Sequence, residues 1–592
     1  MQTNTSFAHS NVLDTVAPQI NPSENQALAA IDPIDSQTIP QALDASKPHL
    51  RQATVNGLSP DRLSQLFEKS QGILDHNQVI RNINGEDYTG TMPSREYYVH
   101  QWFWDSATHA IALAETQPER ALDELASLSM GQWRNGFMGH INFFPDTQEK
   151  IYFPGAQFWK TEQHTPTGTH TSSITQPPIF NMAVPKVLNA VLKDMPTQAE
   201  QRTNQQQKIM ERASKVLDSA LAFTQFLATA RDPEDSGLIT IVHPWESGLD
   251  NAPSWDEPLK HSVFDEHNIP QHVKTAVDQG RRDVVKKTTS PTESSSTPGT
   301  GTTNTNSNTS ERPLQKQYYD YMTLVDQYNQ LGSDQNQIPK VAPFRVKDVL
   351  FTSIFSKGCA ELGKFYRSDT AQRLSLANER HAEWLDDKAQ ASQRALSNTW
   401  DDDMARYLNL DLNADSHEGD VTQPMSGLGK PIRTDTISGF APLLAGLGKN
   451  EQRTARLLNA LDDPMKYKLN FSVPTTAKDN PAFDIKRYWR GSVWPITNFL
   501  TIRGLESVQQ QHQETNPPLA QQATRIKQRL LNDLNQLVDT VGFQEYYIPT
   551  APLEQQRKIG FGAFSWTAAI FMITNADAYR QITQQGATRG ND

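Results

Sequence analysis

Apolar residues recur along most of this chain at the spacing of one face of an α-helix. A helix turns once every 3.6 residues, so apolar side chains three and four positions apart lie on the same side and can pack together. The clearest stripe consists of Met210, Ala213, Leu217, Ala220, Thr224 and Leu227. Similar patterns occupy further segments, namely Trp104 to Leu113, Pro178 to Leu192, Val346 to Leu362, Thr370 to Leu396, Ser438 to Leu447, Val493 to Leu505, Ala520 to Val538 and Trp566 to Tyr579. The sequence therefore predicts an all-α fold with roughly a dozen helices.

Signals for β-strands are few and short. The clearest is Gly237 to Val242, GLITIV, which runs directly into an aromatic and acidic motif. Many helices joined by aromatic-rich loops, with no exact repeat of fixed period, favour helical hairpins that stack and close on themselves.

Two polar segments organise the chain. Residues 1–45 are rich in Asn, Ser, Thr, Gln, Ala and Pro without periodicity, so we expect a disordered leader there and one domain over 46–592. Within that domain, residues 286–310, KKTTSPTESSSTPGTGTTNTNSNTS, predict a flexible insertion. The first helix is expected after Leu58, because Ser59-Pro60-Asp61 offers an N-cap, a proline for the first helical position and an acid for the first turn.

Charge and composition argue against several classes of protein. The formal net charge is −12, and no run of Lys or Arg is interleaved with aromatics, so nucleic acid is not an expected partner. The one cysteine, Cys359, excludes an intrachain disulfide and a Cys metal site, and its apolar helical setting predicts a packing role. No run of 18 apolar residues occurs, and residues 1–22 lack a secretion signal, so we expect a cytoplasmic protein without a membrane span.

Tryptophan and tyrosine gather beside acids and glycines rather than along helix stripes. The clusters are REYY (95–98), HQWFWD (100–105), QWRNGFMGH (132–140), HPWESGLDNAPSW (243–255), YWRGSVW (488–494) and GFQEYYIP (542–549). Flat rings stack on the C–H faces of a sugar while acids and amides bind its hydroxyls, so these clusters predict a carbohydrate site. The alternative is a set of core aromatics with hydrogen-bonded tips.

Two carboxylic acids are the best pair for cleaving a glycosidic bond. That reaction needs one acid to protonate the leaving oxygen and one carboxylate to act as nucleophile or to deprotonate water. Asp250 lies in a Gly-Leu-Asp-Asn turn between Trp245 and Trp255, and apolar rings raise a carboxyl pKa toward that of a working acid. Glu545 lies between Phe543 and a Tyr-Tyr pair that can hold a carboxylate and a water.

Other polar residues compete for these roles. Glu246 and Asp256 are rival acids whose alternative is ion pairing or capping, and Asp105 is either a helix N-cap or an acceptor for two sugar hydroxyls. His140 and His243 could be ligands, but no His-x-x-x-His or Cys/His set accompanies them, so we expect no metal and no redox or nucleotide cofactor.

At these motifs the chain resembles family 63 of the glycoside hydrolases, and within it the bacterial mannosylglycerate and glucosylglycerate hydrolases. The resemblance spans about Arg95 to Ile573 and rests on YYVHQWFWDSATHAI, ELASLSMGQWRNGFMGHINFF, ITQPPIF, HPWESGLDNAPSWD, FRVKDVLF, TISGFAPLLAG, YWRGSVWP, GFQEYY and FSWTAA. Together these stretches are highly specific, and HPWESGxDN and YWRGxVWP would each be suggestive alone.

The resemblance implies an (α/α)6 barrel of six helical hairpins and cleavage of an α-glycoside with inversion. It implies Asp250 as general acid and Glu545 as general base, with carboxyl groups roughly 6.5–9.5 Å apart to admit a water. It also implies a subsite for the cleaved sugar lined by Tyr98, Trp104, Asp105, His140, Gln176, Trp489 and Trp494.

A shorter match concerns the leaving group. The glycerate-releasing members carry an Arg-Pro followed by a Tyr six places after the Arg, which is the relation of Arg312-Pro313 to Tyr318 here. An arginine fork binds a carboxylate through two hydrogen bonds, and the resemblance adds Tyr152 and Tyr488 as glycerate contacts. The alternative for Arg312 is a solvated charge at the end of the flexible insertion.

The sequence thus predicts an inverting α-glycosidase acting on a small glycoside, glucosylglycerate ahead of mannosylglycerate. A trehalase-like or oligosaccharide α-glucosidase is the second hypothesis, because the barrel and its acid pair do not require an anionic leaving group. A sugar-binding protein without catalysis is the third.

Overall fold

The computed structural model describes residues 54–83, 85–144, 152–261, 269–289, 312–414, 429–471 and 473–589. The expected leader, residues 1–45, lies outside these ranges. Of the expected insertion, residues 286–289 form the end of a helix, and the remainder lies outside the described residues. All described residues belong to one compact unit.

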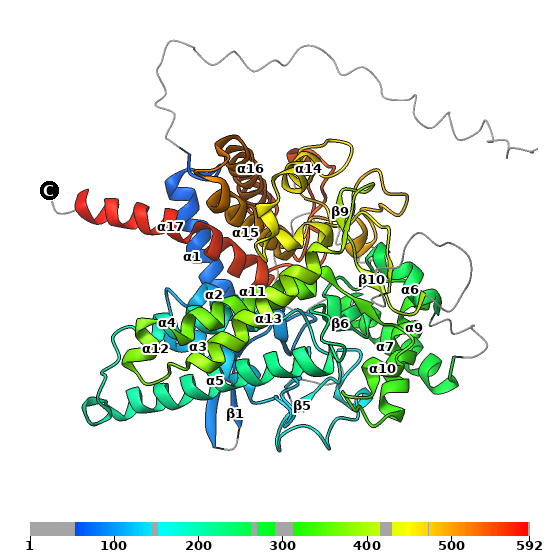
Figure 1. The fold of residues 1–592 in the computed structure, drawn as a ribbon, viewed down its shortest axis with the longest axis horizontal. Helices are drawn as coiled ribbons and strands as arrows, with labels where there is room; N and C mark the ends of the chain where they lie inside the picture. The colour runs from blue at the N-terminus through cyan, green and yellow to red at the C-terminus, as the bar shows by residue number, and fades with distance from the viewer. Residues whose placement is uncertain are drawn as a thin grey trace, which may run out of the picture. The chain divides into compact units, whose positions relative to one another are not determined.

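The described chain is mostly helical, as the periodicity predicts (Figure 1). The longer helices are α1 (Pro60–His76), α2 (Phe103–Leu113), α3 (Pro118–Ser129), α4 (Phe180–Val191), α5 (Asn204–Ala230), α7 (Gln271–Thr289), α9 (Gln315–Gln330), α11 (Val349–Tyr366), α13 (Glu379–Ser397), α14 (Glu451–Leu461), α15 (Pro495–His512), α16 (Pro517–Val541) and α17 (Ser565–Arg589). The short ones are α6 (Asp256–His261), α10 (Ile338–Val341) and α12 (Asp369–Arg373). Short 3₁₀ segments are η2 (Ala156–Phe158), η3 (Ala199–Gln201), η4 (Pro244–Ser247), η5 (Pro253–Trp255), η7 (Ile437–Leu443), η8 (Leu447–Lys449), η9 (Tyr488–Arg490) and η10 (Leu553–Gln555).

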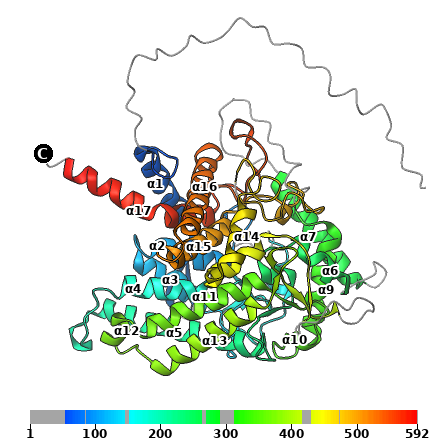
Figure 2. The same cartoon turned by 45° about the horizontal axis from the view of Figure 1, so that its top comes forward.

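The first helix of the described residues begins where the sequence predicts. The Ser59 hydroxyl accepts a hydrogen bond from the Arg62 amide, and Pro60 occupies the first helical position. Helix α1 then packs on α17, where the rings of Phe67 and Tyr579 stack with their centroids 4.0 Å apart. The two ends of the described chain are thereby joined, as Figures 1 and 2 both show.

Neighbouring helices pack as pairs and in sequence around the molecule (Figure 2). The contacting pairs include α2 with α3, α11 with α13, and α15 with α16. A second set of contacts runs from α2 to α4, α11, η7, α15 and α17, and from α17 back to α2. Of the aromatic clusters, 100–105 lies at the start of α2, 488–494 directly precedes α15, and 542–549 lies between α16 and α17.

Three predicted elements differ from the observed ones. The segment Thr370 to Leu396 is two helices, α12 and α13, because Ser375 adopts a left-handed conformation and Asn378 caps the start of α13. The segment Ser438 to Leu447 lies largely in the 3₁₀ segment η7 rather than in an α-helix, since Pro442 cannot donate the hydrogen bond of a helix interior. Of the expected strand 237–242, only Thr240–Ile241 pairs as a strand.

Short antiparallel ladders hold the loops at the ends of the helices. Two of them are two-stranded: β1 (Gln78–Ile83) pairs with β2 (Glu86–Thr91), and β8 (Trp400–Asp401) pairs with β9 (Arg406–Tyr407). A three-stranded ladder contains β3 (Gln101–Trp102), β4 (Ile141–Phe143) and β5 (His170–Thr171). A four-stranded ladder contains β6 (Thr240–Ile241), β7 (Val346–Lys347), β10 (Leu410–Asp411) and β11 (Lys430–Pro431). In the three-stranded ladder Gln101 faces Asn142, and in the four-stranded ladder Thr240 faces Lys347. Strand β3 leads into α2, β4 follows His140, and β6 leads into η4, so the ladders fix the segments that carry the site.

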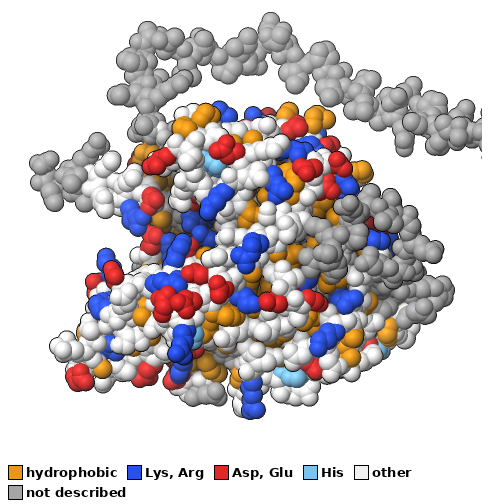
Figure 3. Space-filling model, in the orientation of Figure 1, with side chains coloured by type: hydrophobic (Ala, Val, Ile, Leu, Met, Phe, Trp, Pro, Cys, Tyr) orange, Lys and Arg blue, Asp and Glu red, His pale blue; other side chains and the backbone are white. Residues whose placement is uncertain are grey.

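The surface carries charges of both signs. On the face drawn in Figure 3, the Lys and Arg side chains of the described residues are interspersed with Asp and Glu and form no continuous basic area. Within the described ranges, every helix is too short or too polar to cross a bilayer.

Candidate active site

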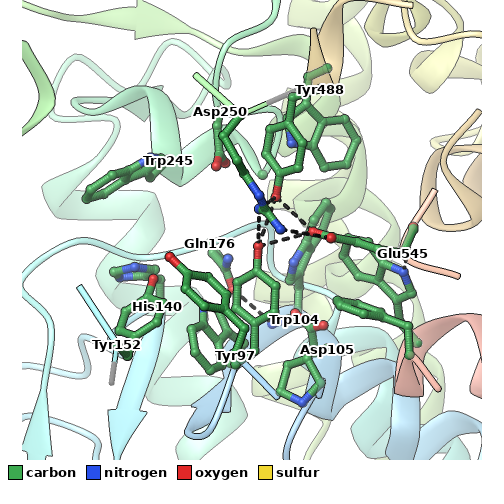
Figure 4. A pocket seen from close by; sticks show the side chains of 18 of the residues that line it. Tyr97, Trp104, Asp105, His140, Tyr152, Gln176, Trp245, Asp250, Tyr488 and Glu545 are labelled. Atoms are coloured by element: carbon green, nitrogen blue, oxygen red, sulfur yellow. Dashed lines mark hydrogen bonds and ion pairs between the residues drawn. The ribbon is translucent and has the colours of Figure 1, made fainter. Parts of the chain in front are cut away.

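The predicted site residues meet in one cleft. Both acids and all but one of the predicted contacts line it: Tyr98, Trp104, Asp105, His140, Tyr152, Gln176, Asp250, Arg312, Tyr318, Tyr488, Trp489 and Glu545. In Figure 4, Asp250 and Glu545 come from different parts of the chain and lie on different sides of the site. Residues distant in the sequence therefore form a single ring-lined hollow.

Trp494 is the predicted contact that does not line the cleft. Its ring is fully buried and stacks on Trp489 at a centroid distance of 3.5 Å. Its indole N–H donates to the carbonyl of Tyr488 at 3.1 Å. Trp494 therefore supports the cleft residues Tyr488 and Trp489 from behind.

Asp250 is held by a turn that several neighbours fix in place. The hydroxyl of Tyr321 on α9 donates to the Asp250 carbonyl at 2.8 Å. The side chain of Asn251 accepts from the Trp489 amide at 3.0 Å, which links this turn to η9. Gly248 precedes the turn with φ of 74°, and a Cβ there would lie 2.5 Å from Trp104, so only glycine fits.

The environment of Asp250 suits a proton donor. Burial raises the pKa of its carboxyl to about 7, against a smaller lowering by the positive charge of Arg312. A carboxyl group with this pKa carries a proton for much of the time near neutral pH.

Glu545 is surrounded by hydrogen-bond donors. Its Oε1 lies 3.1 Å from the Tyr98 hydroxyl and 2.9 Å from the Tyr488 hydroxyl. Its Oε2 accepts from the Phe561 amide at 3.3 Å and from Arg312 Nη2 at 2.9 Å. The side chain is 1% exposed, so its position is fixed by these groups.

Arg312 reaches into the cleft rather than out to solvent. Its Nη1 group donates to the hydroxyls of Tyr98 and Tyr488, and its side chain is 15% exposed. The solvated-charge alternative for Arg312 is therefore wrong. Helix α9, which begins at Gln315, carries Tyr318 and Tyr321 and so links Arg312 to the Asp250 turn.

Asp105 faces the cleft from the first turn of α2. The helix begins after Trp102, and no side chain caps it, so the N-cap alternative for Asp105 is wrong. Burial, and to a smaller extent the nearby Glu545, raises the pKa of Asp105 well above its ordinary value. Beside it, the Trp104 amide donates to the side-chain oxygen of Gln176 at 3.3 Å, which orients that amide.

The two histidines have different surroundings. His140 lines the cleft, its Nδ1 lies 2.5 Å from the Ser172 hydroxyl, and burial lowers its pKa well below the ordinary value. His140 is therefore a neutral ring whose orientation is fixed. His243 lies behind the cleft, where it accepts from the Trp245 amide and contacts the Tyr321 carbonyl at 3.1 Å.

The rival acids have structural partners. Glu246 is fully buried, pairs with Arg231 at 2.7 Å and accepts from the amides of Val242 and Thr175. It joins the 243–250 motif to the segment that carries Gln176. Asp256 pairs with Arg490, and its side chain is 42% exposed. Neither rival lines the cleft.

The cleft also contains residues that sequence reasoning did not select as contacts. They are Pro93, Tyr97, Trp102, Phe153, Trp245, Gly248, Phe564 and Trp566. Tyr97, Trp102, Trp245 and Gly248 lie inside the aromatic clusters, and Phe564 and Trp566 lie in the FSWTAA stretch, so these motifs were the available signal. Pro93 and Phe153 lie outside the motifs, and nothing in their sequence context distinguishes them from core residues.

Comparison with known proteins gives one consistent result. Residues 98–567 match the family model described as the mannosylglycerate hydrolase MGH1-like glycoside hydrolase domain. A mannosylglycerate hydrolase of Thermus thermophilus is 30% identical over 82% of this chain and 96% of its own sequence. The glucosylglycerate hydrolase of Mycolicibacterium hassiacum is 30% identical over 71% of this chain and 82% of its own sequence.

A solved structure agrees with the sequence comparisons. It is the family 63 mannosylglycerate hydrolase from a second strain of Thermus thermophilus, in complex with Tris and D-glycerate. The match includes 86% of this chain and 100% of that one, with 28% sequence identity and a TM-score of 0.61. The resemblance inferred from the sequence motifs is thus confirmed, and this chain belongs to the mannosylglycerate hydrolase MGH1-like family of glycoside hydrolases.

Proposed function

We propose that the protein hydrolyses the α-glycosidic bond of glucosylglycerate or mannosylglycerate with inversion, releasing the free sugar and glycerate. The observation that carries this proposal is that Asp250, Glu545 and Arg312 meet in one aromatic cleft. The two acids provide the proton donor and the base that glycosidic cleavage needs. An arginine inside the cleft can bind an anionic leaving group.

In this mechanism Asp250 is the general acid. It donates its proton to the glycerate oxygen as the bond to the anomeric carbon breaks, and its raised pKa supports that role. Glu545 is the general base, which takes a proton from the attacking water. Inversion requires the two carboxyl groups to stand roughly 6.5–9.5 Å apart, so that water and sugar fit between them.

The remaining cleft residues bind the two halves of the substrate. We assign Trp104, Asp105, His140, Gln176 and Trp489 to the sugar, because they combine ring faces with hydrogen-bonding groups. Tyr98 joins them beside Glu545. Arg312, Tyr152, Tyr318 and Tyr488 are assigned to glycerate. Trp494 stays in the proposal as a supporting residue.

The neutral-sugar alternative receives less support. A trehalase-like or oligosaccharide α-glucosidase has an uncharged leaving group, and a buried arginine in its cleft would have no anionic substrate group to bind. Relatives named as mannosylglycerate and glucosylglycerate hydrolases match this chain over most of its length. A non-catalytic sugar-binding protein would not need two acids in the cleft.

The proposal includes the ring of helices. We propose that α2, α4, α11, η7, α15 and α17 form the inner wall of an (α/α)6 barrel. Each of these elements contacts the next, and α17 contacts α2, which supports closure. The partners α3, α13 and α16 would then belong to the outer wall.

Proton NMR of the hydrolysis tests the proposed function. The purified protein is expected to consume glucosylglycerate or mannosylglycerate, and the first sugar released is expected to be the β-anomer, because water enters opposite the leaving group. Release of the α-anomer first would contradict inversion. Hydrolysis of trehalose but of neither glycerate glycoside would favour the neutral-sugar alternative.

The pH dependence of kcat/KM should follow from the pKa of Asp250. Since Asp250 must carry its proton and has a pKa of about 7, kcat/KM should fall above about pH 7, approaching tenfold per pH unit. Arg312 lowers that pKa, so the Arg312→Ala variant should retain the descending limb but show it at higher pH. Initial rates at low substrate concentration from about pH 5 to 9 measure both profiles. A wild-type profile that does not fall on the alkaline side would exclude Asp250 as the acid.

A further inference from the structure

Arg312 contacts the candidate base directly, although its proposed task is to bind the substrate's carboxylate. Its Nη2 lies 2.9 Å from Oε2 of Glu545. Both N–H groups of Nη1 are directed at tyrosine hydroxyls, those of Tyr98 and Tyr488. The dashed lines that converge on Glu545 and Tyr488 in Figure 4 mark this network. In this arrangement most of the guanidinium's hydrogen-bonding capacity is used within the protein.

The network also occupies the base. A carboxylate offers about four lone-pair sites. Among the described residues, four donor groups lie within hydrogen-bonding distance of Glu545: the Tyr98 and Tyr488 hydroxyls, the Phe561 amide and Arg312. A general base must accept a hydrogen bond from the water whose proton it takes. While Arg312 holds Oε2, Glu545 has little room to accept that bond.

The site that holds Arg312 is well formed. Its guanidinium carbon lies 4.6 Å from the ring centre of Tyr488, 5.1 Å from that of Phe561, and 5.5 Å from those of Tyr97 and Tyr98. Aromatic faces attract a cation at these distances. Rings around the guanidinium and an ion pair at one end define a stable position for this side chain.

We propose that the carboxylate of the substrate frees Glu545 by drawing Arg312 away from it. This inference rests on the proposed function and adds a catalytic consequence to it. An incoming carboxylate offers Arg312 two oxygens, whereas Glu545 offers it only Oε2. When Arg312 turns to that carboxylate, Oε2 loses a donor and can accept the attacking water.

Substrate selection would then act on the chemical step as well as on binding. An anionic leaving group supplies the interaction that prepares the base, whereas a neutral one leaves Arg312 on Glu545. Arg312 is in this sense a positioning residue for Glu545. The carboxylate and the base compete for the same guanidinium, so free glycerate should act as an activator when the substrate lacks a carboxylate.

α-Glycosyl fluorides separate the two roles, because fluoride is a single atom and leaves space for a second small molecule. Water adds to the anomeric carbon, its proton passes to Glu545, and fluoride leaves with the bonding electrons. With α-glucosyl or α-mannosyl fluoride, D-glycerate is expected to raise the initial rate saturably, by about fivefold or more. Glycerol, which lacks the carboxylate, is the matched control and should not raise the rate.

The Arg312→Ala variant provides the second arm. Without the guanidinium Glu545 is free from the start, so this variant should hydrolyse the fluoride faster than unactivated wild type and should not respond to glycerate. A thermal unfolding curve for each protein checks that both are folded. Inhibition or no effect of glycerate on wild type, or a slower fluoride rate in the folded variant, would overturn the proposal.

The outcomes also distinguish this inference from the function on which it rests. If glycerate glycosides are hydrolysed but glycerate does not accelerate fluoride hydrolysis, the proposed function stands and only the proposed release of Glu545 is wrong. If the fluorides are hydrolysed and the glycerate glycosides are not, the proposed substrate is wrong, and the proposed activation by glycerate is wrong with it.

Discussion

Replacing Asp250 by Asn or Glu545 by Gln is expected to lower kcat for a glycerate glycoside by about 10²–10⁴-fold each. Asn cannot donate an acidic proton to the leaving oxygen, and Gln cannot take a proton from water. Steady-state kinetics with the glycerate glycoside measure the loss of activity. Asp256→Asn is the matched control, because Asp256 lies shortly after Asp250 in the chain and outside the cleft, paired with Arg490. It should keep a rate close to that of wild type.

The same variants assign the two roles separately. Fluoride departs with little proton assistance, so Asp250→Asn should recover much of its activity on an α-glycosyl fluoride, whereas Glu545→Gln should stay inactive. Glu545→Gln also leaves Arg312 without its charge partner, so its folding should be checked by thermal unfolding. Equal recovery of both variants would contradict the acid and base assignment. Near-normal rates of both on the glycoside would refute the catalytic pair.

Replacing Arg312 by Ala is expected to raise KM strongly for glycerate glycosides. Removing one partner of a buried, hydrogen-bonded charge pair costs about 2–5 kcal/mol, so kcat/KM should fall by about thirtyfold or more. Kinetics on a glycerate glycoside and on its glycerol analogue measure the effect, and only the glycerate glycoside should be weakened. Arg312→Lys is the control for charge alone and should recover part of the loss, because an ammonium group lacks the planar fork.

An equal effect of Arg312→Ala on the charged and the neutral substrate would remove the argument for glycerate. Unchanged kinetics on both would favour a neutral sugar as the leaving group. These outcomes do not depend on the fluoride experiments, since they compare two glycosides of the same sugar.

Much of the site could be predicted because its residues lie in short motifs. Asp250 and Trp245 belong to one short segment, HPWESGLDNAPSW, and local order brings them together. The helical periodicity likewise predicted α5 and α16 well, since an apolar face is a property of the nearby sequence. Trp494 was predicted as a contact from its motif, but the stacking that places it behind Trp489 depends on the whole cleft.

The contacts between distant segments could not be predicted. Arg312 and Glu545 are 233 positions apart, so nothing in either segment indicates that they form an ion pair. The choice between a catalytic and a structural Glu246 also depended on a tertiary partner, the buried Arg231. The break between α12 and α13 arises from local backbone conformation at Ser375, which apolar periodicity does not detect.

During synthesis, α1 leaves the ribosome long before α17 exists. About 500 residues separate Phe67 from its stacking partner Tyr579, an interval of roughly 25–100 s at ordinary rates of translation. Throughout that interval the apolar side of α1 lacks its final cover and is open to chaperones. Glu545 and Trp566 also emerge late, so a nascent chain that already has Asp250 cannot yet turn over substrate. A complete cleft therefore requires the C-terminal part of the chain, which supplies Glu545, Phe564 and Trp566.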